Sequence, residues 1–414
     1  STKSREADAA TLRLLDEAEG HLIAAGAARN RTPLREEEMA LEECHCMQAY
    51  VRNDREGFVA ACERGLKTFA GLEGGETFHF LRALEIGDEQ EEGRLYDRAI
   101  ALRPKFPLAL YARGQWHLGR RELAEAVGDF ERAIEVKPRF VEALVALGFV
   151  RATGGEMRGA IEAYSRAIEV APAFAISWAN RGVARFGIGE REGGVSDLEE
   201  ALRLDPRVAE YRISLAQILG LSGAAGRAAA LLEEVLKEDP RNAEALLVRA
   251  SIRQLEGDNE GAMSDLDAAL ALDSGSARAR EMRGQLRAVL GEVRAAKEDF
   301  DAALAIEPAR FMSLAGRALV LRALGDEAGA LADLDAAIAI DPREAGVRAI
   351  RADLRVHRGD AKGALEDAEA ILAVTPGDPV GLYERGLARA ALEDVDGSIE
   401  DLEASLAAGG PASR

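Results

Sequence analysis

The apolar and polar positions of this chain recur with a period of 34 residues. Counted from Pro107, the period gives nine copies: 107–140, 141–174, 175–208, 209–242, 243–276, 277–310, 311–344, 345–378 and 379–412. Each copy contains two apolar segments with helical spacing, separated by short segments rich in glycine, proline and acidic residues. The pattern therefore predicts two α-helices per copy, a first helix A and a second helix B, joined by tight turns.

Three columns of the repeat predict how helices A and B pack. Repeat positions 8 and 20 are small in every copy, and position 24 carries a bulky filler in eight of the nine. Small residues let the two helices approach closely, and the filler occupies the space between them. Position 15 is usually glycine followed by an acidic residue, as in Gly257-Asp258 and Gly325-Asp326. We expect the glycine to end helix A in a left-handed turn and the acidic residue to cap helix B.

This pattern resembles the tetratricopeptide repeat family, in a bacterial-type array of nine regular repeats. The resemblance rests on the 34-residue period, on Gly or Ala at positions 8 and 20, and on proline at position 32. It covers 107–412 without an insertion. It implies an all-α fold, a right-handed α-solenoid built from helix-turn-helix repeats. It also implies that helix A lines the concave side of the superhelix, with positions 2, 5, 9 and 12 facing inward.

The first quarter of the chain is less regular. Residues 73–106 are similar to a degenerate tenth repeat, in which Gly87-Asp88, Tyr96 and Pro104 match but His79 and Phe80 do not. Upstream, Thr32-Pro33 predicts a helix start, 34–52 and 55–70 a divergent hairpin, and 4–28 a leading helix. We interpret 1–72 as an irregular helical N-terminal cap of the array. A separate small helical domain is the alternative.

Charge and cysteine content narrow the class of partner. The formal net charge is −20, so phosphate backbones and anionic lipids are repelled, and neither nucleic acid nor a membrane surface is an expected ligand. No apolar run is long enough to cross a membrane. Three cysteines are too few for a disulfide framework, which favours a reducing, cytoplasmic location. The chain lacks an initiator methionine and a polar helix after its last repeat, so it is expected to be a piece of a longer protein or to pack on something at that end.

No catalytic, cofactor or metal site is predicted. The five histidines are scattered, and the sulfurs of Cys44 and Cys46 point apart on a helix because they are two residues apart. Cys46 and Cys62 are better interpreted as small buried residues. With no phosphate-binding loop and no serine–histidine arrangement, we expect no enzymatic activity and no cofactor.

The candidate binding surface is the inward stripe of helix A in the first four repeats. Positions 2, 5, 9 and 12 lie on one face of a helix. The residues predicted to form the groove are Tyr111, Gln115, Val145, Phe149, Ile176, Asn180, Val183, Phe186, Ile213 and Gln217. An apolar channel with sparse amides suits an amphipathic helix or an extended segment with hydrophobic anchors. The phenylalanines at position 34 (Phe106, Phe140 and Phe174) are interpreted instead as packing between repeats.

The function predicted is a non-enzymatic scaffold or adaptor that binds another protein. Two alternatives remain open. The chain could be a regulatory or sensor region of, or a subunit for, a larger enzyme such as a protease or kinase. It could also self-assemble through its last repeat.

Two columns predict a structural ion pair in most repeats. Position 7 is arginine and position 23 aspartate in the same seven copies, and the two copies without arginine are the two without aspartate. Both positions are eight residues from the turn at position 15, so antiparallel helices should bring them level. We expect a bidentate, partly buried Arg–Asp pair between helices A and B of each of these repeats. The arginines would then be structural rather than anion-binding.

Overall fold

The computed structural model describes residues 35–51, 54–69, 76–84 and 88–410, and the regular elements among these residues are all α-helices. The all-α solenoid class is therefore confirmed. The predicted leading helix at 4–28 and the predicted start at Thr32-Pro33 lie outside the described residues. The chain divides into two compact units, Ser1–Tyr211 and Arg212–Arg414, and each is treated by itself below.

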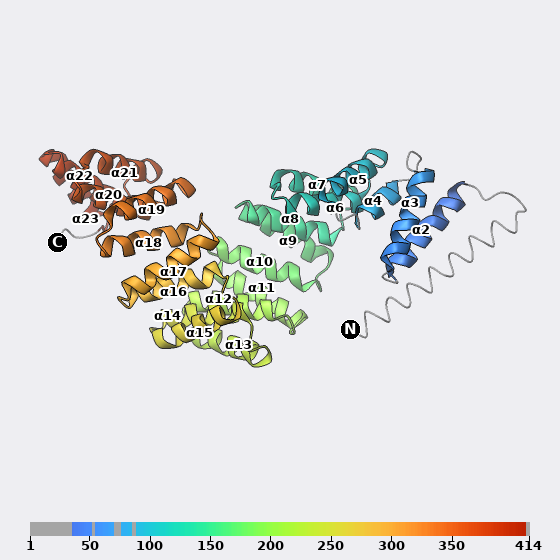
Figure 1. Cartoon of the computed structure of the whole chain (residues 1–414), viewed down its shortest axis with the longest axis horizontal. Coiled ribbons are helices and arrows are strands. Elements are labelled where there is room, and N and C mark those ends of the chain that lie inside the picture. Colours follow the sequence, from blue (N-terminus) through green and yellow to red (C-terminus); the bar gives the residue numbers. More distant parts are fainter. Residues whose placement is uncertain (1–34, 52–53, 70–75, 85–87, 411–414) are drawn as a thin grey trace, which may run out of the picture. The chain divides into compact units, whose positions relative to one another are not determined.

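The first unit consists of helix pairs that follow one another along the chain (Figure 1). Its helices are α2 (Arg35–Val51), α3 (Arg55–Phe69), α4 (Glu76–Ala83), α5 (Glu89–Leu102), α6 (Pro107–Gly119), α7 (Leu123–Val136), α8 (Val141–Thr153), α9 (Met157–Val170), α10 (Ala175–Gly187) and α11 (Arg191–Leu204). The pair α2 and α3 falls on the predicted divergent hairpin. The pair α4 and α5 falls on the degenerate copy, where helix A is only 8 residues long.

The second unit repeats the same arrangement. Helix α12 (Ala209–Leu221) contains the unit boundary, and it is followed by α13 (Ala225–Glu238), α14 (Ala243–Leu255), α15 (Asn259–Leu272), α16 (Ala277–Val289), α17 (Val293–Ile306), α18 (Phe311–Ala323), α19 (Glu327–Ile340), α20 (Ala345–His357), α21 (Ala361–Val374), α22 (Pro379–Ala391) and α23 (Val395–Ala407). Every predicted copy from 107 to 412 thus contains one helix A and one helix B.

The turn between helices A and B has the same backbone in all nine copies. Position 15 has a positive φ throughout, supplied by glycine in seven copies and by Arg121 and Glu393 in the other two. Glycine is favoured there because it has no Cβ to clash in this conformation. The left-handed turn predicted from the sequence is confirmed.

The predicted acidic cap is right for aspartate and wrong for glutamate. The backbone N–H of Gly261 donates to the carboxylate of Asp258 at 2.9 Å, and Asp326, Asp360 and Asp394 cap their helices in the same way. The glutamates at the equivalent position, Glu122, Glu156, Glu190 and Glu292, form no side-chain cap. At this turn the extra methylene of glutamate moves the carboxylate away from the N–H groups that the shorter aspartate reaches, although Glu344 does cap α20.

The small and bulky columns meet as predicted. A Cβ added to Gly114 would lie 2.7 Å from the ring of Phe130, and one added to Gly148 would lie 2.5 Å from the ring of Tyr164. Both rings are buried. Where position 24 carries such an aromatic ring, close packing leaves no room for a Cβ at position 8, and this contact sets the separation of helices A and B.

The Arg–Asp pairs predicted between positions 7 and 23 are present in all seven repeats that carry both residues. Each guanidinium donates through Nε and Nη2 to the two carboxylate oxygens of its aspartate, with Nε–Oδ2 distances of 2.7–2.9 Å. The aspartates are buried and the arginines half-buried. The pairs are Arg113–Asp129, Arg181–Asp197, Arg249–Asp265, Arg283–Asp299, Arg317–Asp333, Arg351–Asp367 and Arg385–Asp401. They fix helix A against helix B, so these arginines are structural.

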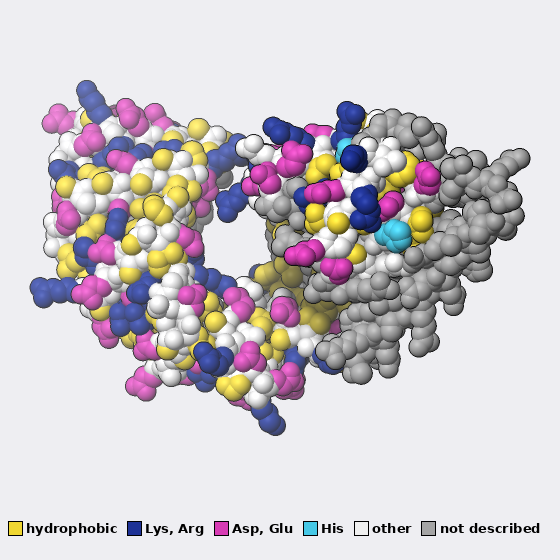
Figure 2. Space-filling view, turned by 45° about the vertical axis from the view of Figure 1, so that its right-hand side comes forward, with side chains coloured by type: hydrophobic (Ala, Val, Ile, Leu, Met, Phe, Trp, Pro, Cys, Tyr) yellow, Lys and Arg dark blue, Asp and Glu magenta, His cyan; other side chains and the backbone are white. Residues whose placement is uncertain are grey.

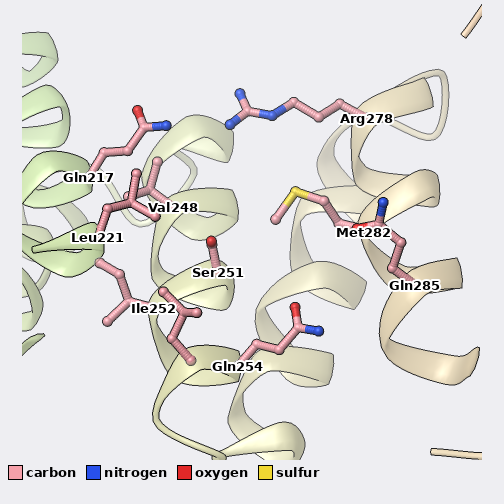
Figure 3. Close-up of a pocket in the computed structure, with 10 residues that line it drawn as sticks. Gln217, Leu221, Val248, Ser251, Ile252, Gln254, Arg278, Met282 and Gln285 are labelled. Atoms are coloured by element: carbon pink, nitrogen blue, oxygen red, sulfur yellow. The ribbon is translucent and has the colours of Figure 1, made fainter. Parts of the chain in front are cut away.

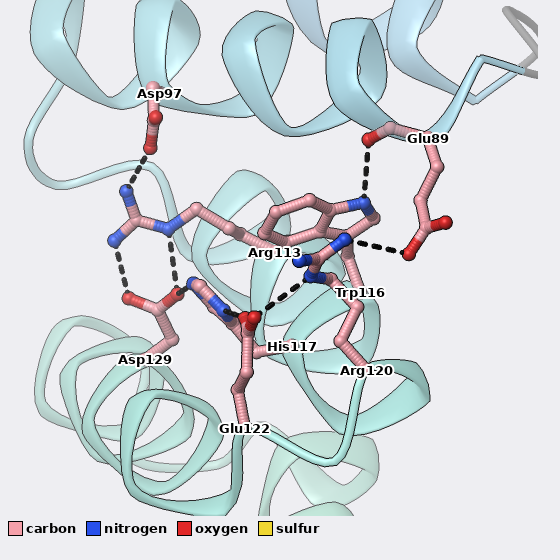
Figure 4. A network of polar contacts seen from close by, with 8 residues as sticks. All are labelled: Glu89, Asp97, Arg113, Trp116, His117, Arg120, Glu122 and Asp129. Carbon is pink, nitrogen blue, oxygen red and sulfur yellow. Dashed lines mark hydrogen bonds and ion pairs between the residues drawn. The ribbon is translucent and has the colours of Figure 1, made fainter.

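In several repeats the same arginine also reaches the preceding helix B. Arg113 donates through Nη1 to Asp97 of α5 at 2.6 Å, as Figure 4 shows, and Arg283 and Arg317 make the equivalent contacts to Asp267 and Asp301. The pKa of Arg113 is raised above its ordinary value, mainly because its guanidinium donates hydrogen bonds to Asp129. One side chain therefore joins three helices, a role that the sequence analysis did not assign to it.

Candidate protein-binding groove

The stripe predicted to face inward in the first unit comes from three successive A helices, α6, α8 and α10. Between them lies a cavity of about 380 Å³. The residues that line it are Tyr111, Gln115, Leu118, Glu142, Val145, Ala146, Phe149, Phe174, Ile176 and Asn180. We call this surface the apolar groove.

Large apolar side chains are exposed in the apolar groove. Phe149 is 50 % exposed, Ile176 39 % and Phe174 38 %. They come from α8, from α10 and from the residue that precedes α10, so one continuous surface combines neighbouring repeats. Clustered exposed apolar residues mark interaction surfaces on proteins, whereas single ones are common everywhere.

The polar groups of the apolar groove are few and mostly uncharged. The amide of Gln115 donates to the hydroxyl of Tyr111 at 3.0 Å. The Tyr111 ring in turn packs against Phe130 and Phe140, with ring centroids 5.7 and 5.2 Å apart. This side of the groove is therefore held in place by the repeat core. Glu142 is the only lining residue with a carboxylate.

Six of the ten residues predicted for the groove line it: Tyr111, Gln115, Val145, Phe149, Ile176 and Asn180. Val183 is exposed on α10 and Phe186 is half-buried there, but neither belongs to this cavity. Ile213 is only 5 % exposed, so its side chain is part of the interior rather than of a surface. Gln217 lies in the second unit and lines a different pocket (Figure 3).

Four lining residues are not among the ten predicted: Leu118, Glu142, Ala146 and Phe174. Leu118 is at position 12 of the inward stripe. Glu142 is at position 2 of the inward stripe, so the stripe alone could have found it. Ala146 lies at position 6, which borders the stripe. Phe174 was assigned to packing with the other phenylalanines at position 34. That interpretation holds for Phe106 and Phe140, which are buried, and not for Phe174.

Charged side chains do not form a large patch of one sign on the face shown in Figure 2, where acidic and basic groups are interspersed.

Cys46 and Cys62 are fully buried, as predicted, with sulfur atoms 3.3 Å apart on α2 and α3. Among the described residues, no cluster of three or more His, Cys, Asp or Glu side chains could hold a metal ion. Within the same residues, no helix is long and apolar enough to span a membrane.

Comparison with known families agrees with the repeat geometry. The sequence pattern of the tetratricopeptide repeat matches residues 93–139, 111–176, 222–277 and 281–345. The chain is a tetratricopeptide repeat protein. These matched segments contain helix pairs with the turn and the small-residue columns described above.

The other comparisons add little to this family assignment. No curated protein sequence matches this tetratricopeptide repeat protein. Among solved structures, the crystal structure of yeast Tom70 is similar over 90 % of this chain and 92 % of that chain, with a TM-score of 0.49 and 14 % sequence identity.

Proposed function

We propose that this tetratricopeptide repeat protein is a non-enzymatic scaffold or adaptor that works in the cytoplasm and binds a partner protein in the apolar groove. Its repeats and fold are of the kind that suggests a protein-interaction scaffold. The observation that carries the proposal is the exposure of Phe149, Phe174 and Ile176 on one continuous surface. Burying such side chains against a partner is favourable by roughly 25 cal/mol per Å² of apolar area.

The chemistry of the groove favours a ligand with apolar anchors. An amphipathic helix presents residues i, i+3, i+4 and i+7 on one face, and an extended segment presents alternate residues. Either can place two or three apolar side chains between α6, α8 and α10. The amides of Gln115 and Asn180 and the carboxylate of Glu142 lie along the same surface and could fix the orientation of the segment.

Site-specific photocrosslinking tests the proposal directly. A photoreactive amino acid would replace Gln115 or Leu118 in the groove, and, as a matched control, Glu162, which is exposed on helix B of the second repeat. In the native cells we expect the same partner to be crosslinked from both groove positions and not from Glu162. Crosslinks from Glu162 alone would place binding on the outer face and overturn the proposal.

A double substitution supplies the second arm of this test. Phe149→Glu with Ile176→Glu puts two carboxylates into the groove at exposed positions, so the fold should survive. We expect the crosslinked partner to disappear while the far-UV circular dichroism is unchanged. Retention of the partner by the folded double variant would contradict the proposal.

A second candidate function, self-association, is favoured by the last helix. Position 28 of helix B is buried or half-buried in the earlier repeats, for example at Ile134 and Leu304, whereas the equivalent Leu406 on α23 is 48 % exposed, and Ile399 on the same helix is exposed as well. A second copy could cover this face. Sedimentation equilibrium would then give a mass that rises with concentration for the natural chain and stays constant for Ile399→Glu. A constant mass for both would exclude this candidate.

A further inference from the structure

The helix pair α2 and α3 follows the same period as the array that comes after it. Counted back from Pro107 by two periods, residues 39–72 correspond to a further copy, in which α2 supplies helix A and α3 supplies helix B. The two helices pack side by side (Figure 1). The positions that face each other in the regular repeats can therefore be located in this pair as well.

Positions 8 and 24 form a close contact between helices A and B in the regular repeats. In the second of them, a Cβ added to Gly148 would lie 2.5 Å from the ring of Tyr164. In the copy at 39–72 these two positions are Cys46 and Cys62, and no other copy has a cysteine at either position. The repeat geometry thus brings two thiols together where helices A and B approach closely. We call Cys46 and Cys62 the thiol pair.

The thiol pair is in direct contact inside the hairpin. The sulfur atoms lie 3.3 Å apart and share a hydrogen bond, and both side chains are 0 % exposed. A disulfide has a sulfur–sulfur distance of about 2.05 Å, so the two sulfurs have to approach by only about 1.3 Å more. An ion pair between Arg64 and Glu42, with N–O distances of 3.0 and 3.2 Å, holds the same two helices together close to the thiols. The hairpin therefore positions both sulfurs for a bond between them.

We propose that the thiol pair is a redox switch, which closes reversibly into a disulfide and ties α2 to α3. The oxidant is a low-molecular-weight disulfide. The thiolate of one cysteine attacks a sulfur of the oxidant, whose S–S bond breaks and releases one small thiol. The second cysteine attacks the resulting mixed disulfide, forms the Cys46–Cys62 bond and releases the second small thiol. In total the thiol pair loses two protons and two electrons, and the oxidant gains them.

Burial makes this reaction depend on opening of the hairpin. The pKa of Cys46 is raised above its ordinary value, mainly because its thiol shares a hydrogen bond with Cys62 and to a smaller extent because it is buried. In the closed hairpin this thiol stays protonated and the oxidant reaches neither sulfur, so the reactive thiolate forms during local opening. The switch should therefore respond to a sustained change of redox potential rather than to a brief one.

The switch depends neither on the partner proposed above nor on the apolar groove, which is built from α6, α8 and α10. Disulfides of reducing compartments are usually transient and redox-sensing, so the switch is compatible with the proposed cytoplasmic location. Its test uses the purified chain alone, so either proposal can fail while the other stands.

Peptide mapping of the full chain tests the proposal. The protein is equilibrated with mixtures of reduced and oxidised glutathione, denatured in acid and alkylated at its remaining thiols. Cys44 is also buried on α2, but its side chain leaves the helix about 200° away from that of Cys46, so it serves as the internal control. In excess oxidised glutathione we expect a link between Cys46 and Cys62, with Cys44 alkylated throughout, and we expect reduced glutathione to reopen the link.

Four results would overturn the proposal. They are a link that involves Cys44, a link between two chains, an unlinked thiol pair in every mixture, and a link that reduced glutathione does not reopen. Variants provide the same separation. Cys44→Ala should keep the link, and Cys62→Ala should abolish it. Loss of the link in Cys44→Ala would likewise contradict the proposal.

Hydrogen exchange measures whether the disulfide ties the two helices together. A cross-link between residues 16 apart removes much of the freedom of the open hairpin, so α2 and α3 should open on the order of 100-fold less often in the oxidised chain than in the reduced one. Exchange of α8 and α9 should not change. Equal exchange of α2 and α3 in the two redox states would overturn the proposed tie. If Cys62→Ala does not fold, the peptide map and the exchange of the natural chain still decide.

Discussion

The two units of this protein share one frame, by which we mean helices A and B with their Arg–Asp pairs and left-handed turns. They differ in the lining, by which we mean the exposed side chains of helix A. Helices A and B are joined by the same bidentate pair in both, Arg181–Asp197 in the first unit and Arg249–Asp265 in the second. The concave linings differ. At position 9 the first unit has apolar residues in two of its three regular repeats, Phe149 and Val183 beside Gln115, whereas the second has glutamine or serine in its first three repeats.

The geometry of helix A explains why lining and frame can differ independently. Positions 7 and 9 are two residues apart and therefore point about 200° apart on a helix. Position 7 faces helix B, where its arginine is held by a buried aspartate, and position 9 points away from helix B, where side chains are half-buried or exposed. A change at position 9 removes few contacts of the core. Each unit can therefore present its own chemistry on a constant scaffold.

Removing one partner of an Arg–Asp pair should reduce stability more than changing a titrating residue, a helix cap or the lining. The loss should be similar in the two units. Arg249→Leu strands the carboxylate of Asp265, which is only 3 % exposed and is then held by Arg253 alone. Removing one partner of a buried pair costs roughly 3–5 kcal/mol, and the remaining bond to Arg253 places the expected loss at the lower end. Hydrogen exchange of α14 and α15 would measure it as faster opening, and Arg181→Leu should act likewise on α10 and α11.

The matching double variant separates charge from packing. Arg249→Leu with Asp265→Leu imitates the fourth repeat, where Leu215 and Leu231 occupy these positions. We expect the double variant to recover much of the stability lost in the single one, since no unpaired charge remains buried. If the double variant instead loses as much stability as the two single variants together, the two side chains do not stabilise the protein as an ion pair.

The frame could be predicted from the sequence because it repeats. Seven covarying copies of positions 7 and 23, and seven turns with glycine at position 15, are enough instances to deduce the pairing and the left-handed turn. The surface could be predicted only in part, because each lining residue occurs once. Phe174 and Phe140 share a column, yet one is exposed and the other buried. Ile213 lies on the inward stripe and is nevertheless covered. Whether a side chain is buried depends on the residues of the neighbouring repeats that cover it. The residue type at one repeat position does not reveal those neighbours.

A pH-dependent loss of stability should distinguish α22 and α23 of the second unit from the equivalent α10 and α11 of the first. Glu384 is buried in α22, with Asp353 and Arg322 nearby, while the equivalent Asn180 of the first unit does not titrate. The pKa of Glu384 is raised to about 7, mainly because the carboxyl group is buried and to a smaller extent because Asp353 repels its charge. Because this folded-state value lies above the ordinary one, stability is greatest below about pH 4.5 and falls as the pH rises to about 7.

The difference between the folded and unfolded pKa of Glu384 also sets how much stability is lost, and a variant that cannot titrate provides the control. Each pKa unit corresponds to about 1.4 kcal/mol, so the loss is at most about 3 kcal/mol. Exchange of α22 and α23 measured from pH 5 to pH 8 would show it, after correction for intrinsic rates. In Glu384→Gln the fall should disappear. An identical pH profile in this variant would assign the dependence to another group.

Helix caps provide a smaller contrast between the units. In the three regular repeats of the first unit the turns have Glu122, Glu156 and Glu190, which do not cap, whereas most turns of the second unit have a capping aspartate, such as Asp258. Asp258→Ala should therefore destabilise α15 by about 1 kcal/mol. Glu156→Ala should change α9 by much less, because no cap is lost. Equal effects of the two substitutions, measured by hydrogen exchange, would show that capping does not distinguish them.

The smallest effect is expected from exchanging the linings themselves. Phe149→Gln gives the first unit the residue that the second unit carries at Gln217 and Gln285, and Gln217→Phe does the reverse. Phe149 is 50 % exposed and Gln217 is exposed, so neither substitution opens a cavity or strands a buried polar group. Surface changes of this kind usually stay within about 0.5 kcal/mol. Opening of α8 and α12, followed by hydrogen exchange, should thus be nearly unchanged in both variants. A loss above about 1 kcal/mol in Phe149→Gln would show that this ring supports the repeat core, and the apolar groove could then not be treated as a surface separate from the frame.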